Sequence, residues 1–337
     1  MNFNSVLRGP WMISPYLLDE ILSAYSSFLD GDGFESNAVI SHTGKQLFSG
    51  DKLYEVVNGT AIIPVHGLII PRMNLFGRIL GATSAEAIQL RFREALYDPR
   101  VEKILLHIDS PGGAAPGTFE LAEFIFRSRG EKPTTAWTDG QMSSAAYLIS
   151  SAAEKRFVSS EAANIGSIGV ITRHRDLSAR EANSGVKTSV LTAGRYKGTG
   201  HPHAPLSNAD KEILQARLDH IYTALINTVA RNLKLSAEKV ATELADGREF
   251  LGSQGIMAGL ADGMCTKDEL CKQGNGGEYQ KISASLVQRS RIAICKMLEL
   301  RPRTVTSSLP VRQVASSPQV NPYVEAMVAF ARSLGRA

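Results

Sequence analysis

Short apolar runs alternate with amphipathic stretches from residue 59 onward. Runs of aliphatic and β-branched residues between turn-forming residues predict strands at 61–65, 68–70, 104–108, 134–137, 156–158, 168–171 and 189–192. Apolar residues spaced three and four apart predict helices at 84–96, 117–129, 143–153, 208–233 and 236–244, with Ser84 and Ser236 as N-caps. Strands that alternate with helices predict an α/β fold.

The two ends of the chain lack this alternation of apolar runs and amphipathic stretches. Residues 1–58 are irregular around one amphipathic helix predicted at 11–29, which Pro15, Asp19 and Glu20 make unsuitable as a membrane span or a signal peptide. Residues 271–337 combine a polar, Gly-rich linker with a tail rich in Ser, Pro and basic residues. The predicted organisation is therefore an N-terminal helical extension at 1–58, an α/β domain at 59–270 and a basic, partly disordered tail at 271–337.

Composition narrows the class of protein. With 43% hydrophobic and 21% charged residues, the chain of 337 residues is neither disordered nor collagen-like and has enough material for a core. Its three cysteines lack paired zinc-site spacing and are too few for a disulfide scaffold, which favours a reducing, cytoplasmic compartment and no bound metal. No motif for a cofactor is present.

Charge is unevenly distributed, although the net charge is only +4. From Lys281 onward, 9 Lys and Arg face 2 Glu, so the tail carries +7 and the first 280 residues carry −3. Such asymmetry predicts that the tail contacts an acidic partner. A solvated tail without a partner is the alternative.

Three stretches place chemically useful residues after predicted strands. Gly112 and Gly113 follow the strand 104–108, where two glycines let main-chain N–H groups face a ligand as an oxyanion hole; a plain tight turn is the alternative. Ser144 lies at the start of a helix beside Ala145 and Ala146, so its hydroxyl is either a nucleophile or a helix cap. Lys197 lies in a Gly-bracketed turn and becomes a general base only where burial lowers its pKa.

Histidines offer a weaker alternative. His201 and His203 follow Lys197 closely, so a Ser–His pair is conceivable, but nothing else marks them. His107 is expected to be a hydrogen-bonded core residue on its strand. The chain has no G-x-S-x-G elbow, because Gly166-Ser167-Ile168-Gly169 has the wrong spacing.

Taken in order, these stretches and four others resemble the signal peptide peptidase A family of Ser–Lys serine peptidases. The resemblance covers residues 59–263, and the matching stretches are IDSPGG at 108–113, MSSAAY at 142–147, AEK at 153–155, GSIGV at 166–170, GRYK at 194–197, GREFLG at 247–252 and AGLAD at 258–262. Within that family, a start without a membrane anchor and an extra tail resemble the lambda-like capsid-assembly (head-maturation) proteases of tailed bacteriophages.

The resemblance implies a crotonase/Clp protease-like fold of repeated ββα units and assigns roles by position. Ser144 matches the nucleophile, Lys197 the general base and Ser167 the hydroxyl that orients the lysine. The backbone N–H groups of Gly113 and Ala145 match the oxyanion hole, although the family often has Gly-Gly where this chain has Ala145-Ala146. The resemblance also implies a homo-oligomeric ring, in which the lysine acts on the serine of its own chain or of a neighbour.

Three functions follow as hypotheses. The first is a serine endopeptidase that cleaves scaffold, capsid or portal proteins in the host cytoplasm, inside a forming phage head. The second is a cytoplasmic bacterial peptidase that degrades hydrophobic peptides. The third is a non-catalytic ring-forming assembly factor. An acyl-CoA enzyme of the wider crotonase fold would share the oxyanion hole but would leave the Ser–Lys pair unexplained.

Overall fold

A computed structural model of the chain describes residues 9–13, 17–19, 21, 23, 53–74, 77–78 and 80–272. The chain divides into two compact units, Met1–Ser283 and Ala284–Ala337, and all described residues belong to the first. The predicted basic tail from Lys281 onward lies outside the described residues, as does most of the predicted linker.

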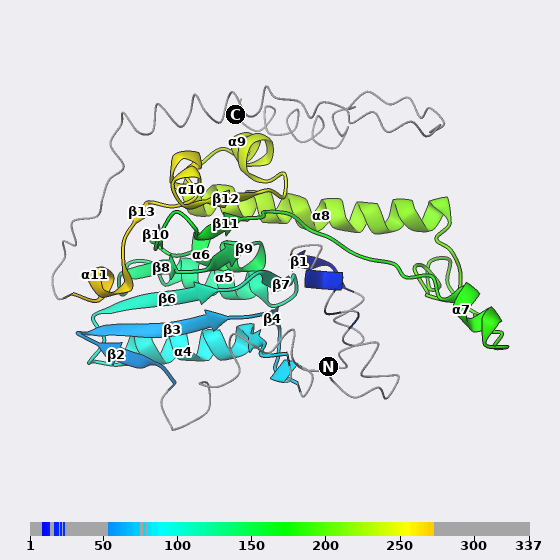
Figure 1. The fold of residues 1–337 in the computed structure, drawn as a ribbon, viewed down its shortest axis with the longest axis horizontal. Coiled ribbons are helices and arrows are strands. Elements are labelled where there is room, and N and C mark those ends of the chain that lie inside the picture. The colour runs from blue at the N-terminus through cyan, green and yellow to red at the C-terminus, as the bar shows by residue number, and fades with distance from the viewer. Residues whose placement is uncertain are drawn as a thin grey trace. The chain divides into compact units, whose positions relative to one another are not determined.

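A six-stranded sheet forms the base of the α/β unit (Figure 1). Its strand order is β13 (Gly263–Met264), β10 (Lys155–Val158), β8 (Thr134–Thr138), β6 (Lys103–Asp109), β3 (Thr60–His66) and β2 (Glu55–Val57). All neighbouring pairs are parallel except β2–β3. Because parallel strands need crossover connections, helices alternate with them along the chain, as the sequence pattern predicts.

Two smaller sheets lie at the ends of these strands, and the predicted site residues other than Lys197 lie in these sheets or directly after their strands. The four-stranded sheet has the order β1 (Trp11–Ile13), β7 (Gly112–Ala114), β4 (Ile69–Ile70) and β5 (Thr83–Ser84). The three-stranded sheet has the order β12 (Glu249–Leu251), β11 (Asn164–Gly166) and β9 (Gln141–Ser143). A bridge between Ser110 and Met142 connects the region of β7 to β9.

Helices alternate with these strands or follow them along the chain. They are α4 (Ala85–Tyr97), α5 (Thr118–Arg127), α6 (Ala145–Ser151), α7 (Ser178–Asn183), α8 (Asn208–Leu233), α9 (Ala237–Lys239), a π-helical turn η1 (Val240–Leu244), α10 (Gly252–Ala258) and α11 (Lys267–Cys271). The predicted caps are confirmed, since Ser84 accepts a hydrogen bond from the Ala87 N–H and Ser236 from the Lys239 N–H. Within the described residues, no helix combines the length and hydropathy needed to cross a bilayer.

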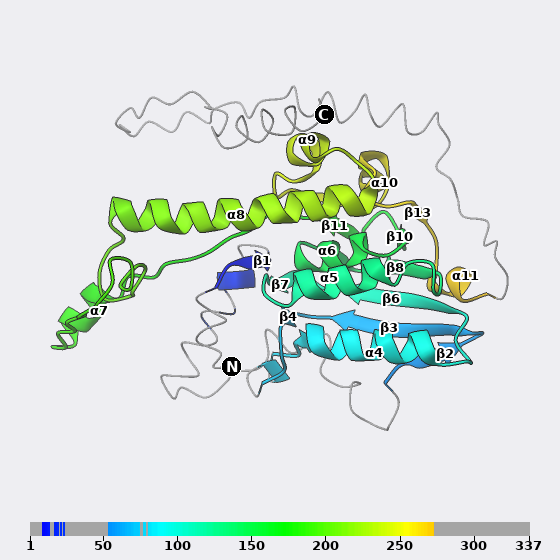
Figure 2. The same ribbon diagram turned by 180° about the vertical axis from the view of Figure 1, so that it is seen from behind.

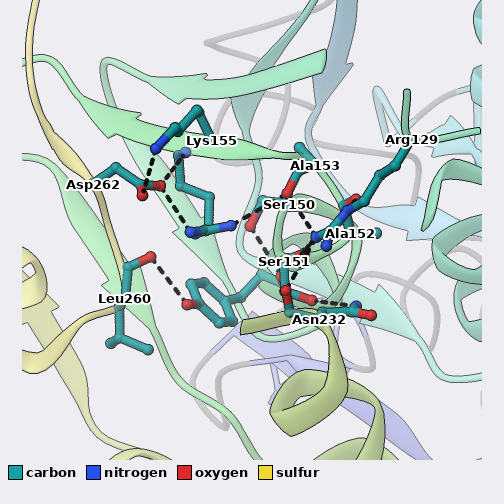
Figure 3. A network of polar contacts seen from close by, with 11 residues as sticks. Arg129, Ser150, Ser151, Ala152, Ala153, Lys155, Asn232, Leu260 and Asp262 are labelled. Carbon is teal, nitrogen blue, oxygen red and sulfur yellow. Dashed lines mark hydrogen bonds and ion pairs between the residues drawn. The ribbon is translucent and has the colours of Figure 1, made fainter. Parts of the chain in front are cut away.

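Helix α6 lies at the centre of the core. All seven of its residues are buried, and the Tyr147 hydroxyl donates to the Leu260 carbonyl at 3.0 Å (Figure 3). At the other end of the helix, the Arg129 guanidinium donates to the carbonyls of Ser151, Ala152 and Ala153 (Figure 3). Both contacts hold α6 in place, and with it the residue that precedes it, Ser144.

Three predicted elements are wrong. Residues 11–13 form strand β1 rather than the start of a helix, because Trp11, Met12 and Ile13 pair with β7; residues 17–19, 21 and 23 are helical. The strand near residue 168 is Asn164–Gly166, and of the predicted stretch 168–171 only Ile171 makes a bridge, to Trp11. Residues 189–192 are exposed and form no regular element, because no described strand pairs with them to complete a ladder.

An exposed arm, residues 172–207, separates the three-stranded sheet from α8. In both views α7, which belongs to the arm, lies beyond the N-terminal end of α8, whereas α9 and α10 lie near the C-terminal end of α8 (Figures 1 and 2). The bounds of α8 match the prediction, but only its second half is packed: its buried residues are Leu225, Ile226, Val229, Ala230 and Asn232. The first half of the apolar stripe therefore stays partly exposed.

Candidate active site

Ser144 occupies a strained turn between β9 and α6. Its backbone angles are φ 56° and ψ −113°, a left-handed conformation that non-glycine residues rarely adopt. It stands at the N-cap position, yet its side chain makes no capping hydrogen bond. Its N–H donates to the Gly166 carbonyl at 2.7 Å, and its carbonyl accepts from the Leu148 N–H at 2.9 Å. The capping alternative is thus wrong, and the turn resembles the strained nucleophile elbow of serine hydrolases.

Ser167 lies beside Ser144 in the register of two parallel strands. β9 and β11 pair Ser143 with Gly166, so the next residue of each strand ends at the same edge. Ser167 also has a positive φ, 51°, and its N–H donates to the Arg248 carbonyl at 2.7 Å. Both serines are nearly buried, with 2% and 8% of their surfaces exposed.

The glycine turn packs closely against Ser144 and its neighbours. A Cβ built on Gly112 would lie 3.0 Å from both the Ser144 Cβ and the Ala145 nitrogen, and 2.2 Å from the Met12 carbonyl oxygen. A Cβ on Gly113 would lie 1.9 Å from the Ile69 carbonyl oxygen. Only glycine fits at either position, so the pair serves close packing beside Ser144 and is more than a tight turn.

Lys197 is the one predicted site residue that the structure does not bring to this group. It lies in the exposed arm, where its N–H donates to the Gly194 carbonyl at 3.1 Å. Within the described residues, no hydrogen bond or ion pair joins it to Ser144 or Ser167. The arm is tied to itself instead, for example by the Leu177 N–H and the Pro202 carbonyl at 2.7 Å.

The histidine alternatives do not reach Ser144. His203 Nδ1 lies 2.7 Å from Glu181 Oε1, within the arm. His107 Nε2 lies 3.0 Å from Asp139 Oδ1, which confirms that this histidine is hydrogen-bonded on its strand. No described contact connects either histidine to the serines.

One polar group at the site escaped the sequence reasoning. Glu249 accepts hydrogen bonds from the side chains of Gln141 at 2.9 Å, Ser143 at 3.0 Å and Asn164 at 3.0 Å. It lies in the GREFLG stretch, but a single glutamate on a short strand carries no local signal of its partners. Those partners lie 85 to 108 residues away in the sequence.

The fold and the site together define a class of α/β protein with a serine on a strained strand-to-helix turn. The serine hydroxyl is not used for capping, and the serine lies beside the backbone of a glycine turn. The model of peptidase family S49 matches residues 127–277, which include Ser144, Ser167 and Lys197. This match, over less than half of the chain, agrees with the family resemblance that the motifs predict.

Individual relatives agree with this assignment. The chain is 34% identical over 233 residues to the head-tail preconnector protein GP5 of Enterobacteria phage P21, and 29% identical over 331 residues to the capsid assembly protease C of Escherichia phage lambda. It is also 27% identical over 231 residues to a putative signal peptide peptidase SppA of Enterococcus faecium. These matches cover 68%, 93% and 68% of this chain, and 46%, 73% and 64% of the relatives. The chain thus spans less than half of the P21 protein.

Proposed function

We propose that the chain is a serine endopeptidase with Ser144 as its nucleophile. The observation that carries this proposal is the strained backbone of Ser144, whose side chain makes no cap and which lies against the glycine turn. A strained backbone at a buried polar residue costs about 1–3 kcal/mol and is typical of functional sites. A structural cap would need neither the strain nor two adjacent glycines.

The remaining roles follow from the chemistry of acyl transfer. A neutral Lys197 amine takes the proton from Ser144 Oγ, and the oxygen attacks the scissile carbonyl. The N–H groups of Gly113 and Ala145 stabilise the oxyanion that forms. Collapse of this intermediate releases the amine product, which takes the proton from Lys197, and water then hydrolyses the acyl-enzyme. Ser167 accepts or donates a hydrogen bond that orients the lysine. The crotonase/Clp protease-like arrangement of the family is the fold in which we place these roles.

The Lys197 that activates a given Ser144 then has to come from another chain. We place the lysine of one subunit at the Ser144 of the next, in a homo-oligomeric ring. The arm supports this arrangement, because its apolar side chains Val186, Leu191 and Tyr196 are 54%, 94% and 56% exposed. A neighbouring subunit would cover these side chains and surround the lysine with protein.

The substrate class is taken from the relatives. Because the lambda relative is named a capsid assembly protease and the P21 relative a head-tail preconnector protein, we propose that the substrates are scaffold, capsid or portal proteins of a forming phage head. The site of action would be the host cytoplasm or the prohead itself. The likeness to a putative signal peptide peptidase keeps degradation of hydrophobic peptides as a second candidate.

The test compares wild type with Ser144→Ala, Lys197→Ala and the exposed control Ser160→Ala. We expect wild type and Ser160→Ala to cleave a co-expressed capsid or scaffold protein, and the other two to leave it intact, as read by intact mass over time. Circular dichroism should show the same fold in all four proteins. Cleavage that persists in Ser144→Ala would overturn the proposal, and a wild type that assembles heads without any cleavage would favour the non-catalytic assembly factor.

A further inference from the structure

Strand β1 lies between the two backbone segments that border Ser144. On one edge it pairs antiparallel with β7, with Met12 opposite Gly113. On the other edge the Trp11 N–H donates to the Ile171 carbonyl, and the Ile171 N–H to the Trp11 carbonyl, both at 2.8 Å. Ile171 is the fourth residue after Ser167. A segment from the start of the described chain thus fills the space between the glycine turn and the strand end that carries Ser167.

The carbonyl of Met12 is directed at the proposed oxyanion hole. The Ala115 N–H donates to the Pro10 carbonyl, and hydrogen-bonded pairs recur every second residue in an antiparallel ladder. The pair two residues along is Met12 and Gly113, so the Met12 carbonyl and the Gly113 N–H face each other. A Cβ built on Gly112 would lie 2.2 Å from the Met12 carbonyl oxygen and 3.0 Å from both the Ala145 nitrogen and the Ser144 Cβ. The Met12 oxygen is therefore within about 5 Å of the Ala145 nitrogen and of the Ser144 Cβ.

The side chains of β1 fill apolar space on both faces. Trp11 and Ile13 are 0% and 4% exposed and pack in a cluster with Leu68, Ile70 and Ala114. Met12 points to the opposite face and is completely buried in the main core. The groove therefore accepts an extended segment with large apolar side chains at alternate positions.

We propose that β1 is an internal substrate mimic, which occupies the peptide-binding position of the active site until a substrate displaces it. The inference rests on the proposed function, since it uses Ser144, Gly113 and Ala145 in their proposed roles. Proteins commonly bind extended peptides by adding them as a strand to an existing sheet, and β1 occupies the position that such a peptide would take between β7 and Ile171. The substrate class that follows is an extended peptide with a bulky apolar residue at the position of Trp11.

A reversible disulfide tests this proposal in the full-length protein. Trp11 lies opposite Ala114, one residue away from the hydrogen-bonded pair Met12–Gly113, so it belongs to a non-hydrogen-bonded pair with closely spaced Cα atoms. In the double variant Trp11→Cys, Ala114→Cys, oxidation would lock β1 in place and dithiothreitol would release it. The assay uses a fluorogenic apolar hexapeptide, with Trp11→Cys alone as the control for cysteine chemistry.

We expect oxidation to lower kcat/KM of the double variant at least about tenfold, and reduction to restore it to or above the wild-type value. Trp11→Ala, which removes the anchor without a disulfide, should raise kcat/KM. Equal activity of the oxidised and reduced double variant would overturn the proposal while leaving the peptidase assignment intact. If wild type cleaves the peptide no faster than Ser144→Ala does, both the proposed function and the proposal about β1 would be overturned.

Discussion

Individual backbone conformations hold the site together. Ser144 and Ser167 both have positive φ angles, and the Ser144 N–H to Gly166 carbonyl bond connects the two turns. Because each such residue costs about 1–3 kcal/mol, the surrounding strands must hold the turns in place. The three hydrogen bonds that Glu249 accepts do this across the small sheet. Gly166 lies between Ser143 and Glu249 in the register and has no side chain, so the carboxylate reaches across it.

Glu249 is therefore predicted to position Ser144 rather than to take part in the reaction. In Glu249→Gln an amide N–H replaces one carboxylate oxygen, so one of the three donors loses its hydrogen bond. We expect kcat to fall about tenfold with little change in KM. Adding Asn164→Asp places an acceptor opposite that N–H and should restore most of kcat. Asp246→Asn, in the loop that precedes β12, is the control. A double variant no better than Glu249→Gln alone would contradict a positioning role.

His66 makes stability depend on pH. Its Nε2 is buried and has no hydrogen-bond partner among the described residues, and the ring lies edge-on to His107, with 4.7 Å between the ring centroids. Burial lowers the pKa of His66 to about 4, with His107 and Arg91 acting in the same direction and Asp109 and Asp139 opposing them. Between about pH 6.5 and 4 the unfolded chain binds a proton at this residue that the folded chain does not. Stability from this group is thus complete above pH 6.5 and is lost as the pH falls toward 4.

We expect His66 to remove about 2 kcal/mol from the free energy of unfolding between pH 7.5 and pH 5. His66→Gln should reduce this pH dependence by the same amount, whatever its effect at pH 7.5. Urea unfolding at both pH values measures the difference. His220→Gln, at an exposed position on α8, should keep the full dependence. An unchanged dependence in His66→Gln would assign the acid sensitivity to other groups.

At the scale of the elements, a single side chain, Arg129, connects the C-terminal ends of α6 and α8. Arg129 donates to Ser151, Ala152 and Ala153 at the C-terminus of α6 and to the Asn232 carbonyl at 3.1 Å, near the C-terminus of α8. A cation at a helix C-terminus satisfies carbonyls that have no partner within the helix and opposes the negative end of the dipole. One guanidinium thereby joins the two helices whose packing holds Ser144.

Arg129→Met should therefore destabilise the fold by about 2–4 kcal/mol, because several buried carbonyls lose their donor. Arg127→Met is the matched control two residues earlier. Its side chain is 77% exposed and paired with Glu123 on the surface, so the expected loss is under about 1 kcal/mol. Thermal or urea unfolding of both variants measures the difference. Similar losses in the two would show that Arg129 adds no more than a surface ion pair.

At the scale of the whole molecule, the arm holds Lys197 away from the Ser144 of its own chain. Under the proposed mechanism, a single chain therefore has an incomplete active site. Helix α8 is 26 residues long, about 39 Å, and its buried residues begin at Leu225. The arm joins its N-terminal end at Ser207, about 25 Å along the axis from Leu225. An interface in which each subunit offers its arm to the next is heterologous, and such an interface forms a ring when the rotation between subunits closes.

Mixed oligomers test this arrangement. Ser144→Ala and Lys197→Ala chains are each expected to be inactive, but co-expressed at equal levels they should regain about a quarter of wild-type activity, because one interface in four would join an intact serine to an intact lysine. Ser144→Ala co-expressed with the double variant Ser144→Ala, Lys197→Ala should stay inactive. Co-purified mixed oligomers without any activity would show that the dyad forms within one chain.

The sequence by itself determined most of the periodic elements and the place of the candidate site. The alternation of strands and helices, the bounds of α8, and the caps Ser84 and Ser236 are local properties, since each depends on residues within a few positions. The motifs around Gly113, Ser144 and Ser167 indicated the site for the same reason. Their roles, and that of Lys197, remain predictions.

Only the tertiary structure decided which distant segments meet. Trp11–Ile13 has an apolar pattern that suits a helix or a strand, and pairing with β7, about 100 residues away, selects the strand. Residues 189–192 have a strand-like pattern but pair with no described strand, and they stay in the exposed arm. A strand is defined by hydrogen bonds to another segment, so its local pattern is insufficient. The same holds for Glu249 and for the place of β1 beside Ser144, because both depend on contacts between residues far apart in the chain.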